Sequence, residues 1–184
     1  MTAPSSARAC GSPAGGPGRL MRILVLLSAM LAFCPSQCIA KATDRLPDVE
    51  LLPLSSGEAP MRLSKAFQGD LALIVLFSPG CPSCEAQIKG AEELLERLGP
   101  NPPFTLVPIA TSYYPVGFTQ AVWDSWTVKS KGYAEKEEGL FKHLKVRNVP
   151  VLIWASKDLA VKGMRRSPTS QGELRQDLKK LTGL

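Results

Sequence analysis

Histidine and cysteine are scarce in this sequence, with one histidine and five cysteines among 184 residues. A single histidine excludes a protein with several zinc sites, and five cysteines are too few for a disulfide-dense miniprotein. Charged residues make up 21% of the chain and hydrophobic residues 45%, as in ordinary globular proteins. The length therefore allows one domain together with a short additional segment.

Acidic residues are missing from residues 1–42, which contain the four bases Arg8, Arg19, Arg22 and Lys41. The rest of the chain has 18 bases and 16 acids, so most of the formal charge of +6 belongs to this first segment. Such a small excess of bases does not support a nucleic-acid-binding surface. We therefore expect no nucleic-acid partner.

A membrane-spanning run is also missing, because the apolar run Ile23–Phe33 has 11 residues and a spanning helix needs roughly 20. A basic start, a short apolar run and then Ala40-Lys41-Ala42 are typical of a secretory signal peptide. We expect cleavage after residue 42, or alternatively after residue 40, which leaves residues 43–184 as the mature domain. Residues 1–20 could be a misassigned extension. The expected location is the bacterial periplasm, and the alternative is a protein anchored in the membrane by an uncleaved N-terminal segment.

Cleavage would leave only two cysteines, Cys81 and Cys84, in an exported chain. Disulfides form and persist in exported proteins, so this pair is expected to be able to close. The two thiols and His143 cannot supply the four ligands of a structural zinc site. No metal site and no organic cofactor are expected.

Strands and helices alternate along residues 43–184, which predicts an α/β fold. Continuous apolar runs predict strands buried on both faces over Leu71–Phe77, Phe104–Ala110 and Val149–Ala155. Shorter strands are expected at Val49–Leu54, Met61–Leu63 and Leu159–Met164, and helices at Cys84–Leu98, Phe118–Val128, Glu135–Leu144 and from Ser170 onward. Residues 43–48 are predicted to be a linker, and residues 112–140 contain no clear strand.

The motif Cys81-Pro82-Ser83-Cys84 stands between a predicted buried strand and a predicted helix. A helix N-terminus presents unpaired N–H groups and a partial positive charge, which both stabilise a thiolate. The first cysteine should therefore have a lowered pKa and act as the nucleophile. Pro82 suits the first helical turn, and Cys84 lies close enough to close a disulfide with Cys81. A purely structural disulfide would close a very small loop and stabilise little, so redox chemistry is favoured.

The segment Leu73–Ile88, which contains this motif, resembles the active-site strand and helix of thioredoxin-fold proteins. The segment Val146–Ile153 is similar to the one that carries their cis-proline, and Leu46–Gly69 is similar to the N-terminal addition of the exported TlpA-like, redoxin-type branch. This resemblance implies a three-layer fold, in which a central mixed β-sheet is flanked by helices. It also implies that the protein is a thiol-disulfide oxidoreductase.

In that family the loop with the cis-proline lies beside the nucleophilic sulfur and contacts the bound peptide. The resemblance therefore implies that Val149, Pro150 and Pro82 contact the substrate, while Cys81 and Cys84 form the redox-active disulfide. The implied partners are exported proteins with cysteines, such as apocytochrome c, and a membrane or exported thiol that donates electrons. Similarity to the TlpA-like branch favours reduction over oxidation of the partner.

The sequence departs from the family at the position of a buried acid, which the strand Leu71–Phe77 lacks. Glu85 follows the motif but is expected to face solvent, so no base for Cys84 is identified. Three alternatives stay open at this point. They are a peroxiredoxin-like peroxidase, a metallochaperone that binds copper, and a binding module without enzymatic activity that contains an inert disulfide.

Overall fold

The computed structural model describes residues 45–55 and 57–183. The predicted leader, residues 1–42, lies outside the described residues, so the signal peptide stays a prediction. The described residues form a seven-stranded sheet in the order β2-β1-β5-β4-β3-β6-β7. These strands are β1 Glu50–Pro53, β2 Met61–Arg62, β3 Leu71–Phe77, β4 Thr105–Ala110, β5 Tyr133–Glu135, β6 Val151–Ser156 and β7 Val161–Arg165.

The sheet is mixed, as the sequence predicted. Strand β4 pairs in parallel with β3 and with β5, whereas β6 runs antiparallel to both β3 and β7. Strand β1 completes the sheet by pairing antiparallel with β2 and β5. Strand β3, which leads into the cysteine motif, therefore lies inside the sheet, paired with β4 over residues 72–77 and with β6 over residues 71–76.

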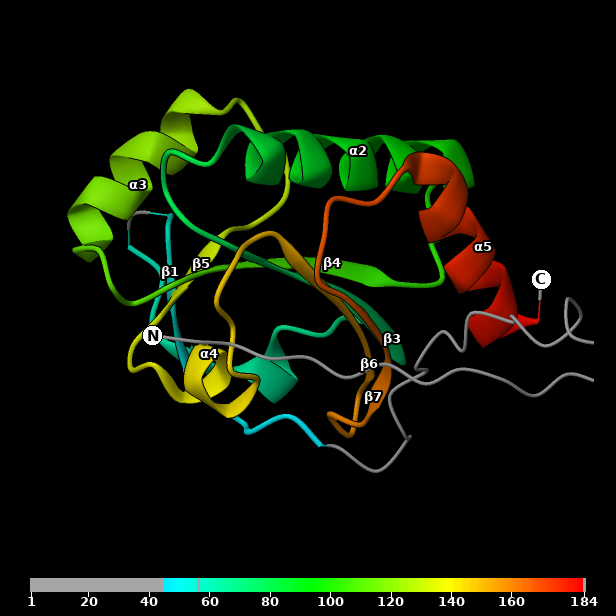
Figure 1. Ribbon diagram of the computed structural model, residues 1–184, viewed down its shortest axis with the longest axis horizontal. Helices are drawn as coiled ribbons and strands as arrows, with labels where there is room; N and C mark the ends of the chain where they lie inside the picture. Colours follow the sequence, from blue (N-terminus) through cyan, green and yellow to red (C-terminus); the bar gives the residue numbers. More distant parts are fainter. Residues whose placement is uncertain (1–44, 56, 184) are drawn as a thin grey trace, which may run out of the picture. The chain divides into compact units, whose positions relative to one another are not determined.

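Helices cover both faces of the sheet, so the expected three-layer arrangement is confirmed (Figure 1). They are η1 Leu63–Lys65, α2 Pro82–Leu98, α3 Val116–Ser125, α4 Gly139–His143 and α5 Gln171–Thr182. Helices α2, α3 and α5 pack on one face, and the short elements η1 and α4 pack on the other.

Strand β3 shows why its sequence is a continuous apolar run. Leu73, Val75 and Phe77 pack toward α2, whereas the residues between them pack toward α4. Every residue from Ala72 to Phe77 is at most 1% exposed. Because neighbouring side chains of a strand point to opposite faces, a strand covered on both sides needs apolar residues at every position.

The ends of α2 and α5 follow signals that are visible in the sequence. Pro82 occupies the first turn of α2, and Gly99 ends that helix with a φ of 87°, which favours glycine. Helix α5 begins with a complete capping box, in which Ser170 and Glu173 satisfy each other's backbone N–H groups.

Two expectations for the region before β6 were wrong. Residues 133–135 form strand β5 between β1 and β4, where no strand was expected. The predicted helix Glu135–Leu144 is reduced to α4, because Glu135 belongs to that strand. A strand of three residues is too short to show alternation. Its pairing with β1 on one side and β4 on the other defines it instead.

The described part of the predicted linker, residues 45–48, packs against the domain instead of standing free. Leu46 is 4% exposed, and its N–H donates to the Leu159 carbonyl at 2.8 Å. The Arg45 guanidinium also donates to the Asp158 carbonyl at 2.6 Å. Burial of one leucine and these hydrogen bonds attach the start of the domain to the β6–β7 hairpin.

Candidate active site

The two motif cysteines form a disulfide at the start of α2. Their Cα atoms lie 5.2 Å apart, within the range that a disulfide can bridge. Strand β3 ends at Phe77, and a loop of three residues leads from it to Cys81, the N-cap of α2. A strand paired on both sides and a helix of 17 residues thus hold the disulfide between two rigid elements.

The Cys81 sulfur occupies the position of a capping oxygen. It accepts a hydrogen bond from the backbone N–H of Cys84 at 3.2 Å, and the Ser83 hydroxyl lies 3.3 Å away. The first N–H groups of a helix lack partners within the helix and carry a partial positive charge. In the reduced protein the same groups would face a Cys81 thiolate and stabilise its negative charge.

Burial distinguishes the two sulfur-bearing residues. Cys84 is 0% exposed and packs in the core with Ile88 and Ala91 of the same helix face. Cys81 is partly exposed, and Pro82 and Ser83 between them are exposed. A partner molecule can therefore reach Cys81 from solvent, whereas it cannot reach Cys84.

Val149 and Pro150 lie at the same end of the sheet as the disulfide. Strand β6 runs antiparallel to β3 with Val151 opposite Leu76, so Pro150 comes next to Phe77. The Val149–Pro150 peptide bond is cis. Val149 is half-buried and packs on the same apolar cluster as Cys81, whereas Pro150 is buried.

Glu85 was expected to face solvent, and the structure places it partly exposed on the surface of α2. Its carboxylate forms an ion pair of 2.7 Å with Lys89, one turn further along α2. Glu135 is the buried acid among the described residues, at 1% exposure. Its carboxylate accepts hydrogen bonds from the backbone N–H groups of Leu140 and Phe141 and so stabilises the start of α4. Neither carboxylate is therefore assigned as a base for Cys84.

Burial raises the pKa of Glu135, and the backbone N–H groups at the start of α4 oppose this shift only in part. The folded protein thus holds this proton over a pH interval in which the unfolded chain has lost it. The resulting stabilisation is full below the unfolded pKa and is lost as the pH rises through the higher folded pKa. We expect the free energy of unfolding of the wild type, relative to Glu135→Gln, to fall as the pH rises. Urea unfolding of both proteins at several pH values measures this difference, and a constant difference would contradict it.

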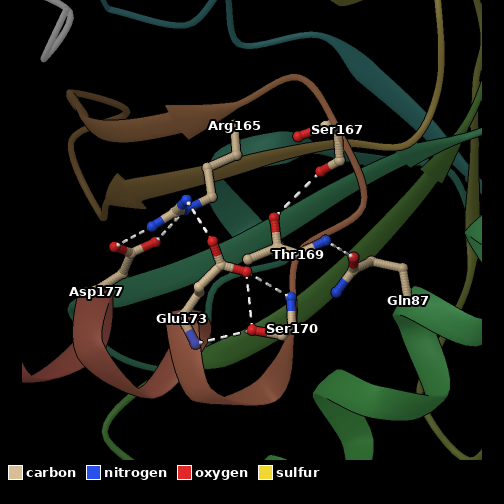
Figure 2. A network of polar contacts seen from close by, with 7 residues as sticks. All are labelled: Gln87, Arg165, Ser167, Thr169, Ser170, Glu173 and Asp177. Atoms are coloured by element: carbon tan, nitrogen blue, oxygen red, sulfur yellow. Dashed lines mark hydrogen bonds and ion pairs between the residues drawn. The ribbon is translucent and has the colours of Figure 1, made fainter. Parts of the chain in front are cut away.

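Gln87 is a buried polar residue on α2 that the sequence analysis missed. Its side-chain oxygen accepts the backbone N–H of Thr169 at 2.7 Å, and both residues are less than 10% exposed. Figure 2 shows Gln87 extending from α2 to the segment before α5, where Ser170 and Glu173 form the capping box. Arg165 joins the same network through Glu173, whose carboxylate accepts from its guanidinium at 3.4 Å, and it also makes a bidentate contact with Asp177. The helix that carries the cysteines is thereby tied to α5.

Replacing Gln87 with alanine should lower the free energy of unfolding by about 1–3 kcal/mol, because the buried Thr169 N–H would lose its acceptor. Gln68→Ala is the matched control, since Gln68 is exposed and its backbone, not its side chain, makes the hydrogen bond to Thr105. The control should change stability by less than about 0.5 kcal/mol. Urea unfolding of the three proteins tests this, and equal stability of both variants would refute the role of Gln87.

The described residues contain no group of three or more histidine, cysteine, aspartate or glutamate side chains placed to hold a metal ion. Within the same residues, no helix combines the length and the apolar composition that crossing a bilayer requires.

Solved structures with a similar fold include proteins described as oxidoreductases. One is a secreted Mycobacterium tuberculosis disulfide oxidoreductase homologous to E. coli DsbE, at 21% identity and a TM-score of 0.55, which covers 72% of this chain and 96% of that one. Another is the thioredoxin domain of a thiol-disulfide oxidoreductase from Bacteroides vulgatus, at 10% identity and a TM-score of 0.62, covering 75% and 95%.

Peroxidoxin BcpB from Mycobacterium tuberculosis is also similar, at 16% identity and a TM-score of 0.61, covering 77% of this chain and 96% of that one. No family model matches the sequence, and no curated protein matches it. At these identities the likeness shows the fold. The chain therefore has a thioredoxin-like fold, as the sequence predicted.

Proposed function

We propose that the protein catalyses thiol–disulfide exchange with cysteine-bearing proteins through Cys81 and Cys84. The observation that carries this proposal is the difference between the two residues at the start of α2. Cys81 is partly exposed and its sulfur accepts a helix N–H, while Cys84 is fully buried. This arrangement supports Cys81 as the attacking group and Cys84 as the resolving group, and the chemistry needs no metal or organic cofactor.

The exchange consists of two displacements at sulfur. The Cys81 thiolate attacks one sulfur of the partner's disulfide, a mixed disulfide forms, and the partner's other sulfur leaves as a thiolate. The Cys84 thiolate then attacks the Cys81 sulfur and releases the second partner thiolate. The two protein thiols are oxidised to a disulfide, the partner's disulfide is reduced to two thiols, and the two protons pass through solvent.

The proposal also includes a location and a direction. The protein is exported, and it reduces its partner. The secreted oxidoreductase among the similar structures supports an exported location, and the resemblance to the TlpA-like branch supports reduction. The partners would be exported proteins with cysteine pairs, such as apocytochrome c, and a membrane or exported thiol would return the electrons. Thioredoxin-fold proteins span reduction potentials from about −270 to about −120 mV, so a measured potential tests the direction.

Val149, Pro150 and Pro82 are proposed to contact the partner around the attacked sulfur. Pro82 is exposed beside Cys81, and Val149 is half-buried on the same apolar cluster. Pro150 is buried, so its part would be to shape the loop rather than to offer a side chain. A partner chain lying across these residues would place its own disulfide within reach of Cys81.

The test uses Cys84→Ser protein, in which the resolving step is blocked. Mixed with bis(2-hydroxyethyl) disulfide, this variant should gain the mass of one mercaptoethanol unit, located at Cys81 by peptide mapping. An unmodified Cys81 would refute the proposal and would support the alternative of a binding module whose Cys81–Cys84 disulfide is inert. Rapid consumption of hydrogen peroxide by the same variant would support the peroxidase alternative instead, and tight binding of Cu(I) by the reduced wild type would support a metallochaperone.

A further inference from the structure

A groove of about 660 Å³ opens at the end of the sheet where α2 begins. Its lining includes Ser78, three residues before Cys81, and Val149, the residue before Pro150. Thr111 joins them, because its N–H donates to the Phe77 carbonyl at 3.1 Å. The groove thus runs beside the segments that carry the disulfide and the Val149–Pro150 bond.

Aromatic side chains from the loop before α3 are among the residues that line this groove. Tyr113 and Tyr114 line it, with their ring centres 5.1 Å apart in an edge-to-face contact. Phe118 continues the group at 5.7 Å from Tyr114. Tyr113 is 76% exposed and Phe118 is 50% exposed, and they are the large exposed apolar side chains of the described residues. Exposed aromatic groups of this kind are common anchors for a partner molecule.

Three cationic side chains also line the groove. Lys142 comes from α4, while Lys145 and Arg147 follow it on the way to Val149. Glu138 is the one acid among the lining residues, so three positive charges face a single negative one. None of the three cations forms an ion pair with another described residue, whereas Lys129, Lys131 and other surface cations do. The excess charge of the groove is therefore available to a ligand.

We propose that this groove binds an acidic segment of the polypeptide whose cysteines react with Cys81. This inference rests on the proposed exchange function and names its substrate class. The occupant must bring carboxylates to Lys142, Lys145 and Arg147 while a disulfide reaches Cys81, and one polypeptide chain can supply both. An apolar or aromatic side chain of the same segment packs against Tyr113 and Tyr114. Charge complementarity then selects the partner mainly through its association rate.

The test compares three peptides of equal length, each with one internal disulfide, flanked by aspartate, by serine or by lysine. Stopped-flow mixing with the reduced wild type gives the second-order rate constant of each reaction. At low ionic strength we expect the acidic peptide to react about tenfold faster than the serine peptide, because electrostatic steering accelerates association on this scale. The lysine peptide should react slowest. The preference should shrink as salt is added, since the Debye length falls to about 10 Å at 0.1 M.

The variant Lys142→Gln/Lys145→Gln/Arg147→Gln should reduce the ratio of the acidic to the serine rate toward one. Its matched control, Lys157→Gln/Lys179→Gln/Lys180→Gln, removes the same total charge from exposed positions outside the groove and should keep the ratio. The single change Lys145→Glu provides a second variant and should lower the ratio below that of the wild type.

Equal rates for the three peptides with the wild type, or loss of the preference in both triple variants, would overturn the groove assignment. A failure of the wild type with every peptide and with bis(2-hydroxyethyl) disulfide would instead refute the exchange function. A dimer that sedimentation detects in the wild type, and that the groove variant loses, would assign the cations to a second copy of this chain and would also overturn the inference.

Discussion

Replacing Cys81 with serine should abolish thiol–disulfide exchange, with a rate at least about a thousandfold lower, as is common when an enzyme loses its nucleophile. The serine oxygen can occupy the same cap position but cannot form a disulfide. The remaining sulfur of Cys84 is 0% exposed, so it cannot replace Cys81 as the attacking group. The rate is measured as the reduction of bis(2-hydroxyethyl) disulfide by the reduced protein.

Cys84→Ser is the matched comparison for this experiment, because it removes the same atom from the other cysteine. That variant should complete the first displacement and stop at the mixed disulfide, whereas Cys81→Ser should form none. A Cys81→Ser protein that forms a mixed disulfide through Cys84 would contradict the assigned roles. It would mean that the helix opens enough to expose a sulfur that the structure buries.

Replacing Phe77 with alanine should cost about 3–5 kcal/mol of unfolding free energy, the range for large aromatic residues in a core. Phe77 is 1% exposed at the end of β3. Its ring centre lies 5.3 Å from those of both Trp123 and Trp126, so the substitution would leave a cavity against two large rings. Because Phe77 is the last residue of β3 before the loop to Cys81, the lost packing lies next to the disulfide.

The control for this prediction is Phe118→Ala, which removes the same side chain from a position that is 50% exposed. It should cost less than about 1 kcal/mol, because little buried area is lost. Urea unfolding of the oxidised proteins gives both values. A loss below about 1 kcal/mol for Phe77→Ala would show that the aromatic cluster is not the packing unit that the ring distances indicate.

The elements nearest the disulfide could be predicted from sequence because their signals are local. Strand β3 was predicted at its observed bounds, since seven apolar residues in a row indicate a strand buried on both faces. Helix α2 was predicted from Cys84 and begins two residues earlier, at Pro82, which suits a first helical turn, and the start of α5 followed from its capping box. In each case the residues that determine the structure are neighbours in the chain.

The features that sequence reasoning missed depend on contacts between distant segments. Strand β5 exists because β1 and β4 pair with it on either side, not because its three residues show a pattern. Gln87 looks like an ordinary helical residue until Thr169, 82 positions later, is placed beside it. The cationic groove was likewise hidden, because Tyr113 and Lys142 approach it from different elements.

The disulfide combines a feature that could be predicted from sequence with one that depends on tertiary packing. The spacing of Cys81 and Cys84 predicted that they could bond, and the structure places them in a disulfide. Their unequal exposure could be predicted in part, because the spacing of Cys84, Ile88 and Ala91 places Cys84 on the apolar face of α2, whereas the depth at which that face is buried depends on packing against the sheet. That unequal exposure is what assigns different proposed roles to two otherwise identical side chains.

We infer that in the reduced protein the Cys81 sulfur is ionised near neutral pH, because it lies at the N-terminus of α2. The direct measurement is the rate of alkylation of Cys81 by iodoacetamide in reduced Cys84→Ser protein as a function of pH. We expect the rate to reach half its maximum at a pH between about 3.5 and 7.5, as for cysteines at helix N-termini. A midpoint at or above about 8.5, the pKa of a free cysteine, would show that the helix N-terminus does not ionise Cys81.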